Sequence, residues 1–224
     1  AKARPHLRLT LYYNRRCCHT VWSRLRSSLS KGHPVKNLFV FSLGLVVAMA
    51  VGGTATAEDV VKSGPQEGDS LGAFYVTKIA GAEDDGIDVD QNLCYRCRNG
   101  RKPHVIVFTR SSDEKVAELV AKLDKAVSEN ASSKLCVFVN MLGEDKDDAT
   151  KQAKQLAAKT KAKNVPFVVP NEFENGPDNY GINSKAEVTV TLASDLGVKS
   201  SHAVAKADQL DVDSVLSDIQ KILN

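Results

Sequence analysis

One succession of apolar segments, between residues 105 and 139, constrains the fold more than any other feature of this 224-residue chain. Residues 105–109 (VIVFT) and 135–139 (LCVFV) have the β-branched and aromatic content of buried strands. Between them, Ser111 and Glu114 have the spacing of a helix capping box. Apolar residues then recur at helical spacing, at Val116, Leu119, Val120, Leu123 and Val127. A strand, a helix and a second strand in this order predict a right-handed parallel crossover.

The chain after this unit predicts a mixed sheet covered by helices. Residues 147–162 predict a helix with one apolar side and a solvated lysine side, and residues 167–169 predict a short third strand. Residues 188–192 and about 200–205 predict a hairpin. The chain then ends in an amphipathic helix for which Asp211 is the expected cap. We therefore expect an α/β sandwich with a mixed central sheet.

Charge divides the chain at Glu58. The sequence has 30 basic residues (Lys and Arg) and 27 acidic ones; none of the acidic residues precedes Glu58, whereas 9 of the basic residues do. The remainder therefore carries 21 basic and 27 acidic residues, so its net charge is near −6 although that of the whole chain is +3. A net negative domain argues against a nucleic-acid partner.

Residues 35–57 have the order of a signal peptide. Lys36 precedes the apolar run 38–51, and small residues ending in Ala55-Thr56-Ala57 follow it. The run is shorter than the roughly 18 residues of a membrane span. We expect cleavage near Ala57, which predicts a secreted or periplasmic protein. An uncleaved anchor is the alternative, and in that case only the leader would contact a membrane.

The domain limits follow from this leader. Residues 1–34 lack hydrophobic periodicity, and we interpret them as an upstream extension, with translation starting at Val35; an unusually long leader is the alternative. Residues 58–224 then form one domain, with N-terminal strands and a C-x-x-C hairpin in 58–103 and the core in 104–224. Such a length buries a core without the help of disulfides.

The predicted order of elements resembles the thioredoxin fold, in the variant found in peroxiredoxins and exported thiol-disulfide oxidoreductases. The resemblance covers most of residues 64–224. Residues 68–81 (GDSLGAFYVTKIAG), with Gly68, Phe74 and Gly81, are similar to the amino-terminal strand of that group. Tyr180-Gly181-Ile182 is similar to its Tyr-Gly-Val segment, and residues 188–204 to its closing hairpin. The resemblance implies a three-layer sandwich, here with an N-terminal β-hairpin extension.

The usual active site of that group is not predicted here. Its reactive cysteine follows the first core strand, where a helix N-terminus lowers the thiol pKa. Residues 109–114 (TRSSDE) contain no cysteine, and no histidine stands near Ser111 or Ser112 in the sequence to replace it. The group also places a cis-proline before its hairpin strand, but residues 184–187 (SKAE) contain no proline. Pro166 would be the candidate only if the strands were assigned differently.

A C-x-x-C pair, Cys94 and Cys97, instead precedes the core strand, and these are our candidate catalytic residues. Asn99-Gly100 behind them predicts a tight hairpin turn. Basic side chains nearby would favour the thiolate over the thiol; they are Arg96, Arg98, Arg101 and Lys102. The same pair is compatible with a structural disulfide or idle thiols.

Metal binding by the pair is a weaker alternative. Zinc takes about four ligands, and only His104 and His202 could join the two sulfurs. Haem attachment is disfavoured because Arg98, not histidine, follows Cys97. The acidic run 83–90 lacks the spacing of a calcium loop and predicts a solvated loop. We therefore expect no metal and no cofactor, and we expect Cys136, in an apolar run, to be a buried inert thiol.

Two functions of different class remain. One is an extracytoplasmic thiol-disulfide exchange protein that uses Cys94 and Cys97 on a protein thiol or disulfide partner. The other is a non-catalytic thioredoxin-like binding module with a structural disulfide. Whether the chain is an enzyme stays open at this point.

Overall fold

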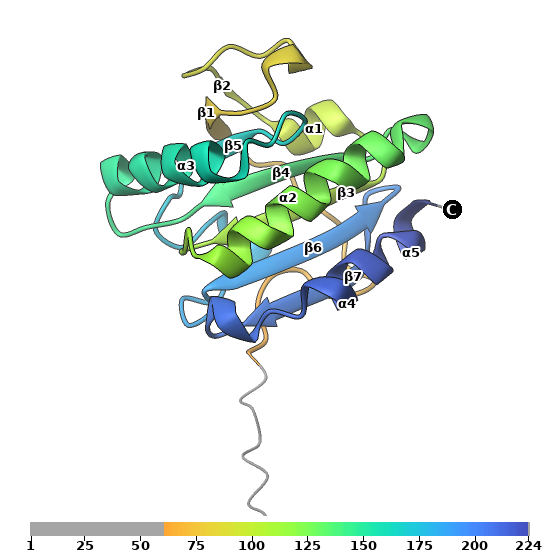
Figure 1. The fold of residues 1–224 in the computed structure, drawn as a ribbon. Coiled ribbons are helices and arrows are strands. Elements are labelled where there is room, and N and C mark those ends of the chain that lie inside the picture. Colours follow the sequence, from red (N-terminus) through yellow and green to blue (C-terminus); the bar gives the residue numbers. More distant parts are fainter. Residues whose placement is uncertain (1–60, 224) are drawn as a thin grey trace, which may run out of the picture. The chain divides into compact units, whose positions relative to one another are not determined.

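A seven-stranded mixed sheet forms the centre of the computed structural model, which describes residues 61–223 (Figure 1). The predicted upstream extension and signal peptide lie outside the described residues. The strands follow one another across the sheet in the order β2-β1-β5-β4-β3-β6-β7. They are β1 Val76–Ala80, β2 Asn92–Leu93, β3 His104–Thr109, β4 Cys136–Met141, β5 Phe167–Pro170, β6 Val188–Ser194 and β7 Gly197–Val204.

The middle of the sheet is the predicted crossover unit. β3 pairs in parallel with β4, with Val105 opposite Val137, and β4 pairs in parallel with β5. On its other side β3 pairs antiparallel with β6, and β6 forms the predicted hairpin with β7. β1 and β2 form an antiparallel pair next to β5, which confirms the N-terminal β-hairpin extension.

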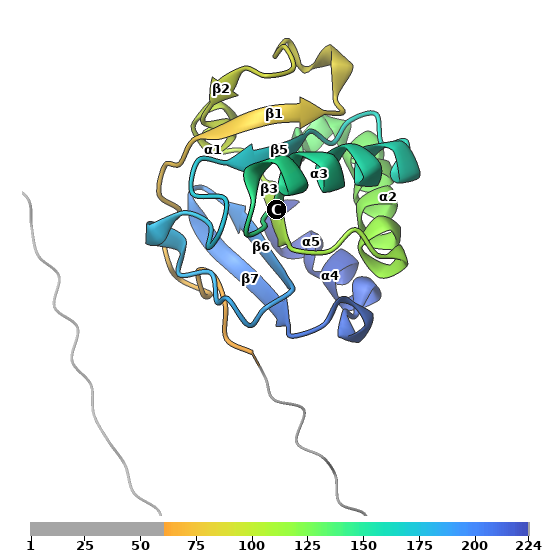
Figure 2. The ribbon, with the colours of Figure 1, turned by 90° about the vertical axis from the view of Figure 1, so that its left-hand side faces the viewer.

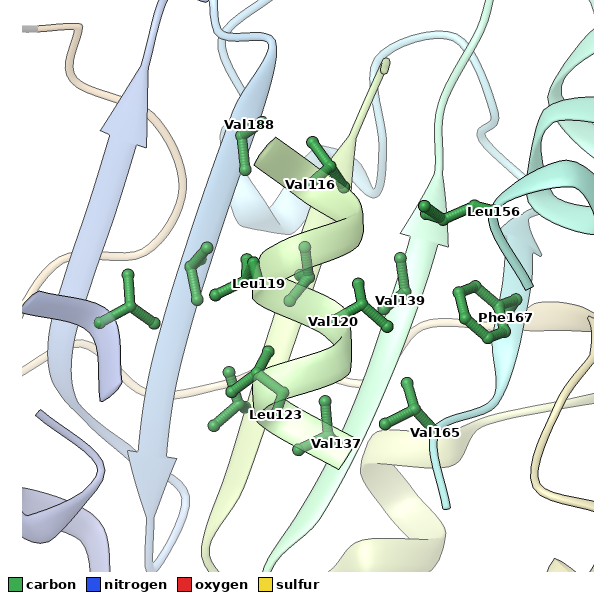
Figure 3. Packing of buried hydrophobic residues seen from close by; sticks show 14 of the residues in the cluster. Val116, Leu119, Val120, Leu123, Val137, Val139, Leu156, Val165, Phe167 and Val188 are labelled. Atoms are coloured by element: carbon green, nitrogen blue, oxygen red, sulfur yellow. The ribbon is translucent and has the colours of Figure 1, made fainter. Parts of the chain in front are cut away.

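Four helices cover one face of this sheet (Figures 1 and 2). They are α2 Glu114–Glu129, α3 Lys146–Thr160, α4 Val212–Asp218 and α5 Gln220–Leu223. The apolar stripe of α2 packs on alternate residues of the strands, and Figure 3 shows Leu119, Val120 and Leu123 above Val137 and Val139. These alternating positions are those that the sequence pattern predicted for the core.

The opposite face has a different cover, made of the short helix α1 (Tyr95–Asn99) and irregular chain. Leu71, Phe74 and Tyr180 pack there against Phe108 and Phe138. The third layer of the sandwich is thus largely loop. Single 3-10 turns complete the fold at Glu83–Asp85, Ala131–Ser133, Asp178–Tyr180 and Ala207–Gln209.

Two local predictions are wrong. α2 begins at Glu114 with Asp113 as its N-cap, and Ser111 does not form the capping box, because its Oγ accepts a hydrogen bond from the Asp113 N–H instead. Asn99-Gly100 does not join two strands but ends α1, and Gly100 follows with a positive φ of 62°. The expected cap of the last helix is confirmed, since the Asp211 side chain accepts from the Ser214 N–H.

Among the described residues, no helix combines the length and the apolar character that crossing a membrane requires.

Candidate functional site

Cys94 and Cys97 are joined by a disulfide, with their Cα atoms 5.2 Å apart. Cys94 follows β2 directly and is the N-cap of α1; its backbone is extended and the residue is 8% exposed. Cys97 lies in the first turn of α1 and is exposed. The Cys97 N–H points at Cys94 Sγ from 3.0 Å. The structure thus places both predicted residues at the start of one short helix, at an edge of the sheet.

The two residues between the cysteines anchor this helix. The Tyr95 ring is buried and stacks on Phe138 of β4, with 5.7 Å between ring centroids. Its hydroxyl donates to Asp85 Oδ2 at 2.7 Å. The Arg96 guanidinium donates to the carbonyl oxygen of Leu71. α1 is therefore fixed from the sheet and from the chain on either side of β1.

Asp85 belongs to a buried ion pair that the sequence analysis missed. Lys78, in the middle of β1, is 2% exposed, and its Nζ donates to Asp85 Oδ1, Ala82 O and Ile87 O at 2.8 to 2.9 Å. The prediction of a purely solvated acidic run is wrong at this residue. The detectable signal was a single lysine inside the strand VTKIA, directly before that run. A buried ammonium requires a counter-charge and a full set of acceptors.

This network also determines the state of Tyr95. Burial first, and then the Asp85 carboxylate, raise the pKa of the Tyr95 hydroxyl far above its ordinary value. The hydroxyl therefore remains a protonated donor at any physiological pH. The position of α1 does not depend on a titration in that range.

The basic residues around the pair bind elsewhere. Arg98 Nη2 donates to Asp85 O at 2.7 Å, and Arg101 Nε pairs with Asp195 at 3.1 Å, while Arg96 is engaged with Leu71. We expected these guanidinium groups to stabilise a thiolate, but each of them binds an oxygen of another residue and not a cysteine sulfur. The hydrogen bond from the Cys97 N–H is the contact that would stabilise an anion on Cys94.

The position that carries the reactive cysteine in the resembling group is built differently here. Thr109 ends β3, and its hydroxyl forms a local turn with Ser111. Arg110 then lines a hollow of about 760 Å³ beside the start of α3. Burial lowers the pKa of its guanidinium, whose Nη1 donates to the Glu174 carbonyl. Residues 184–187, directly before β6, lie next to this turn, because the Arg110 N–H donates to Glu187 O. β6 is therefore the hairpin strand beside β3, as predicted, and the segment before it has no proline.

The other candidate ligands do not join the cysteines. His104 is buried at the start of β3, and its Nδ1 lies 2.8 Å from Lys102 O. His202 lies on β7, with Nε2 3.0 Å from Asp218 Oδ2. In residues 61–223, no three His, Cys, Asp or Glu side chains converge as a metal site requires.

Cys136 differs from its prediction in one respect. It is partly exposed at the first position of β4, not buried. Its Sγ lies 3.3 Å from Lys134 O, and partial burial raises the pKa of the thiol. A raised pKa keeps the sulfur in the less reactive protonated form.

Comparison with known proteins identifies the fold. A protein from Chlorobium tepidum described as a putative thiol:disulfide interchange protein DsbE matches with a TM-score of 0.51 at 15% sequence identity, over 71% of this chain and 99% of that chain. AhpC from Mycobacterium tuberculosis matches with a TM-score of 0.52 at 15% identity, over the same shares. An uncharacterized conserved protein from Geobacillus kaustophilus gives 0.51 at 10% identity, over 72% of this chain and 85% of that one.

These likenesses confirm the predicted thioredoxin-like fold. No protein-family model matches the chain, and no curated protein matches it in sequence. The assignment of the fold by comparison therefore rests on structural similarity alone. The role of the Cys94–Cys97 pair must be argued from its own geometry.

Proposed function

We propose that this thioredoxin-like chain is an exported protein that exchanges disulfides with protein thiols through Cys94 and Cys97. The observation that carries the proposal is the closed pair itself: Cys97 is an exposed residue that a partner could reach, and Cys94 Sγ faces a hydrogen-bond donor that would stabilise it after cleavage. Thiol-disulfide exchange needs an accessible sulfur and a stabilised leaving thiolate. The leader-like order of residues 35–57 supports export to a compartment where disulfides persist.

A second candidate function is a binding module in which the disulfide is structural. The anchoring of Tyr95 and Arg96 favours it, because both residues between the cysteines are fixed to the fold. The absence of a cysteine from residues 109–114 also favours it. In that case the disulfide would only hold the first turn of α1.

The reduction potential of the pair separates the two functions. The full chain would be equilibrated across a glutathione redox series, trapped with a thiol-alkylating reagent and mapped by mass spectrometry, with Cys136 as the internal control. Exchange proteins have potentials in the range of about −120 to −270 mV, and we expect this pair to fall there. A pair that stays oxidised below about −300 mV would be structural and would contradict the exchange function.

A matched pair of variants gives the second arm of the test. Cys94→Ser and Cys97→Ser should each abolish reversible exchange with a protein dithiol, whereas Cys136→Ser should leave it unchanged. If both of the first two variants keep the exchange rate of the parent, the exchange function is wrong.

A further inference from the structure

The two sulfurs of the pair are not equally accessible. Cys94 is 8% exposed, lying between the end of β2 and the buried Tyr95, whereas Cys97, in the first turn of α1, is an exposed residue. A thiolate that opens a disulfide must reach the sulfur it attacks, so access determines which sulfur is attacked. Cys97 offers that access, and Cys94 does not.

The two sulfurs also differ as leaving groups. Cys94 Sγ has the Cys97 N–H 3.0 Å away while the disulfide is still closed. A hydrogen bond to the charged form lowers a pKa, and a sulfur of lower pKa leaves faster. The donor is a backbone amide held by α1, so it needs no rearrangement when the bond breaks.

We propose that Cys97, the second cysteine of the motif, forms the mixed disulfide with the partner, and that Cys94 is the leaving sulfur, which resolves the mixed disulfide when the exchange runs in reverse. This inference rests on the proposed exchange function and assigns a role to each atom of it. Access and leaving-group stabilisation, which are independent observations, give the same assignment.

The exchange runs in two balanced steps. A thiolate of a partner dithiol attacks Cys97 Sγ, forming a partner–Cys97 bond; the Cys94–Cys97 bond breaks and its electron pair leaves on Cys94 Sγ. The second partner thiol, as a thiolate, then attacks the partner sulfur that is bonded to Cys97. The partner–Cys97 bond breaks, and Cys97 leaves as a thiolate. The partner dithiol is oxidised to a disulfide, and Cys94 and Cys97 are reduced to thiols that take up the two protons released by the partner.

Single-cysteine variants test the assignment, all in full-length chains that carry Cys17→Ser, Cys18→Ser and Cys136→Ser, so that no other cysteine of the sequence can form the adduct. Cys94→Ser leaves Cys97 as the only thiol of the described domain, and Cys97→Ser leaves Cys94. Each reduced variant would react with glutathione disulfide, and the mixed disulfide would be timed by intact mass. We expect the chain that keeps Cys97 to react at least about tenfold faster, because access limits the other. Equal rates, or faster reaction of the chain that keeps Cys94, would overturn the assignment.

Two controls keep the result interpretable. In denaturing urea both variants should react at similar rates, which shows that the folded environment causes the difference. In the chain that retains both Cys94 and Cys97, glutathionylated species trapped by acid should carry the adduct at Cys97, and this arm needs no variant of the pair to fold. A potential in the exchange range with adducts at Cys94 would refute this inference alone. A pair that glutathione cannot reduce would refute the proposed function instead.

Discussion

At the scale of single residues, the most consequential side chain is a buried lysine that the sequence analysis did not single out. Lys78 lies inside the fold with three acceptors around its ammonium group, one of them the Asp85 carboxylate. Asp85 also accepts from Tyr95, the residue directly after Cys94. Lys78 is thus linked to the start of α1 through Asp85 and Tyr95.

Lys78→Met should destabilise the domain strongly. The substitution keeps the aliphatic bulk but leaves the Ala82 and Ile87 carbonyl oxygens without their donor and Asp85, which still accepts from Tyr95 and the Ile87 N–H, without its counter-charge. Removing one partner of a buried pair costs about 3–5 kcal/mol, and we expect the loss to lie toward the lower end because the Asp85 side chain is 20% exposed. The free energy of unfolding from urea titration measures this. Lys115→Met is the matched control, because the Lys115–Glu118 pair is exposed to solvent and its loss should change the free energy of unfolding much less. Similar losses in the two variants would contradict the buried role of Lys78.

His104 predicts a pH dependence of stability. Burial first, and then the charge of Arg96, lower the pKa of its imidazole, outweighing the hydrogen bond to Lys102. The unfolded chain therefore binds a proton near the ordinary pKa of about 6.5 while the folded chain does not. Stability should be fully present above that pH and should fall as the pH drops below it, by up to about 1.4 kcal/mol per pH unit.

Urea unfolding at neutral and mildly acidic pH checks this sign. His104→Asn retains a donor for the Lys102 carbonyl but cannot titrate, so its stability should change less over the same interval. If the parent and the variant lose the same stability on acidification, other groups are responsible.

At the scale of elements, α1 shows where prediction from sequence succeeds and fails. β3, α2 and β4 were predictable because apolar residues recur there at strand and helix spacing over many residues. α1 has five residues, too few for a period, and it exists because Cys94 caps it and Tyr95 and Arg96 anchor it. Asn99-Gly100 favours a tight turn between strands when read locally, and only these distant contacts decide against that. The sequence was enough to select Cys94 and Cys97 as candidates, but not to predict that they lie at the start of a helix.

Tyr95→Phe tests the anchoring of α1. The variant keeps the stacking on Phe138 but loses the hydroxyl bond to Asp85, so we expect a loss of about 1–3 kcal/mol in unfolding free energy. Tyr75→Phe is the matched control, since Tyr75 is 55% exposed and its change should stay within about 0.5 kcal/mol. A Tyr95→Phe chain as stable as the control would show that Asp85 does not hold the helix.

At the scale of the whole molecule, the helices α2 to α5 lie on one face of the sheet, and the candidate site lies at α1, within the largely irregular cover of the other face (Figures 1 and 2). The helical face supplies most of the apolar core, including residues from β3, β4, β5 and β6. Opening or closing the Cys94–Cys97 bond therefore leaves the main core untouched. The site and the stability of the fold are largely separate.

Reduction should accordingly leave the domain folded. The disulfide closes a loop of only a few residues, for which the chain-entropy model gives about 2 kcal/mol. We expect the circular dichroism of the reduced chain to match that of the oxidised chain, with a modest decrease in Tm. Loss of secondary structure on reduction would contradict this.

Residues 63–71 bind to parts of the chain that lie far away in the sequence. Ser63 Oγ lies 2.7 Å from Thr189 Oγ1, 126 residues away, and the Gly64, Gly68 and Leu71 N–H groups donate to Gly181, Val198 and Leu196. Gly64 is required there, because a Cβ on its backbone would lie 2.8 Å from the Thr189 side chain. These partners lie far later in the chain, so residues 63–71 cannot find them until residues 181–198 have been synthesised. Contacts so distant in sequence slow folding, and the order of synthesis itself delays the native state until the hairpin β6–β7 exists.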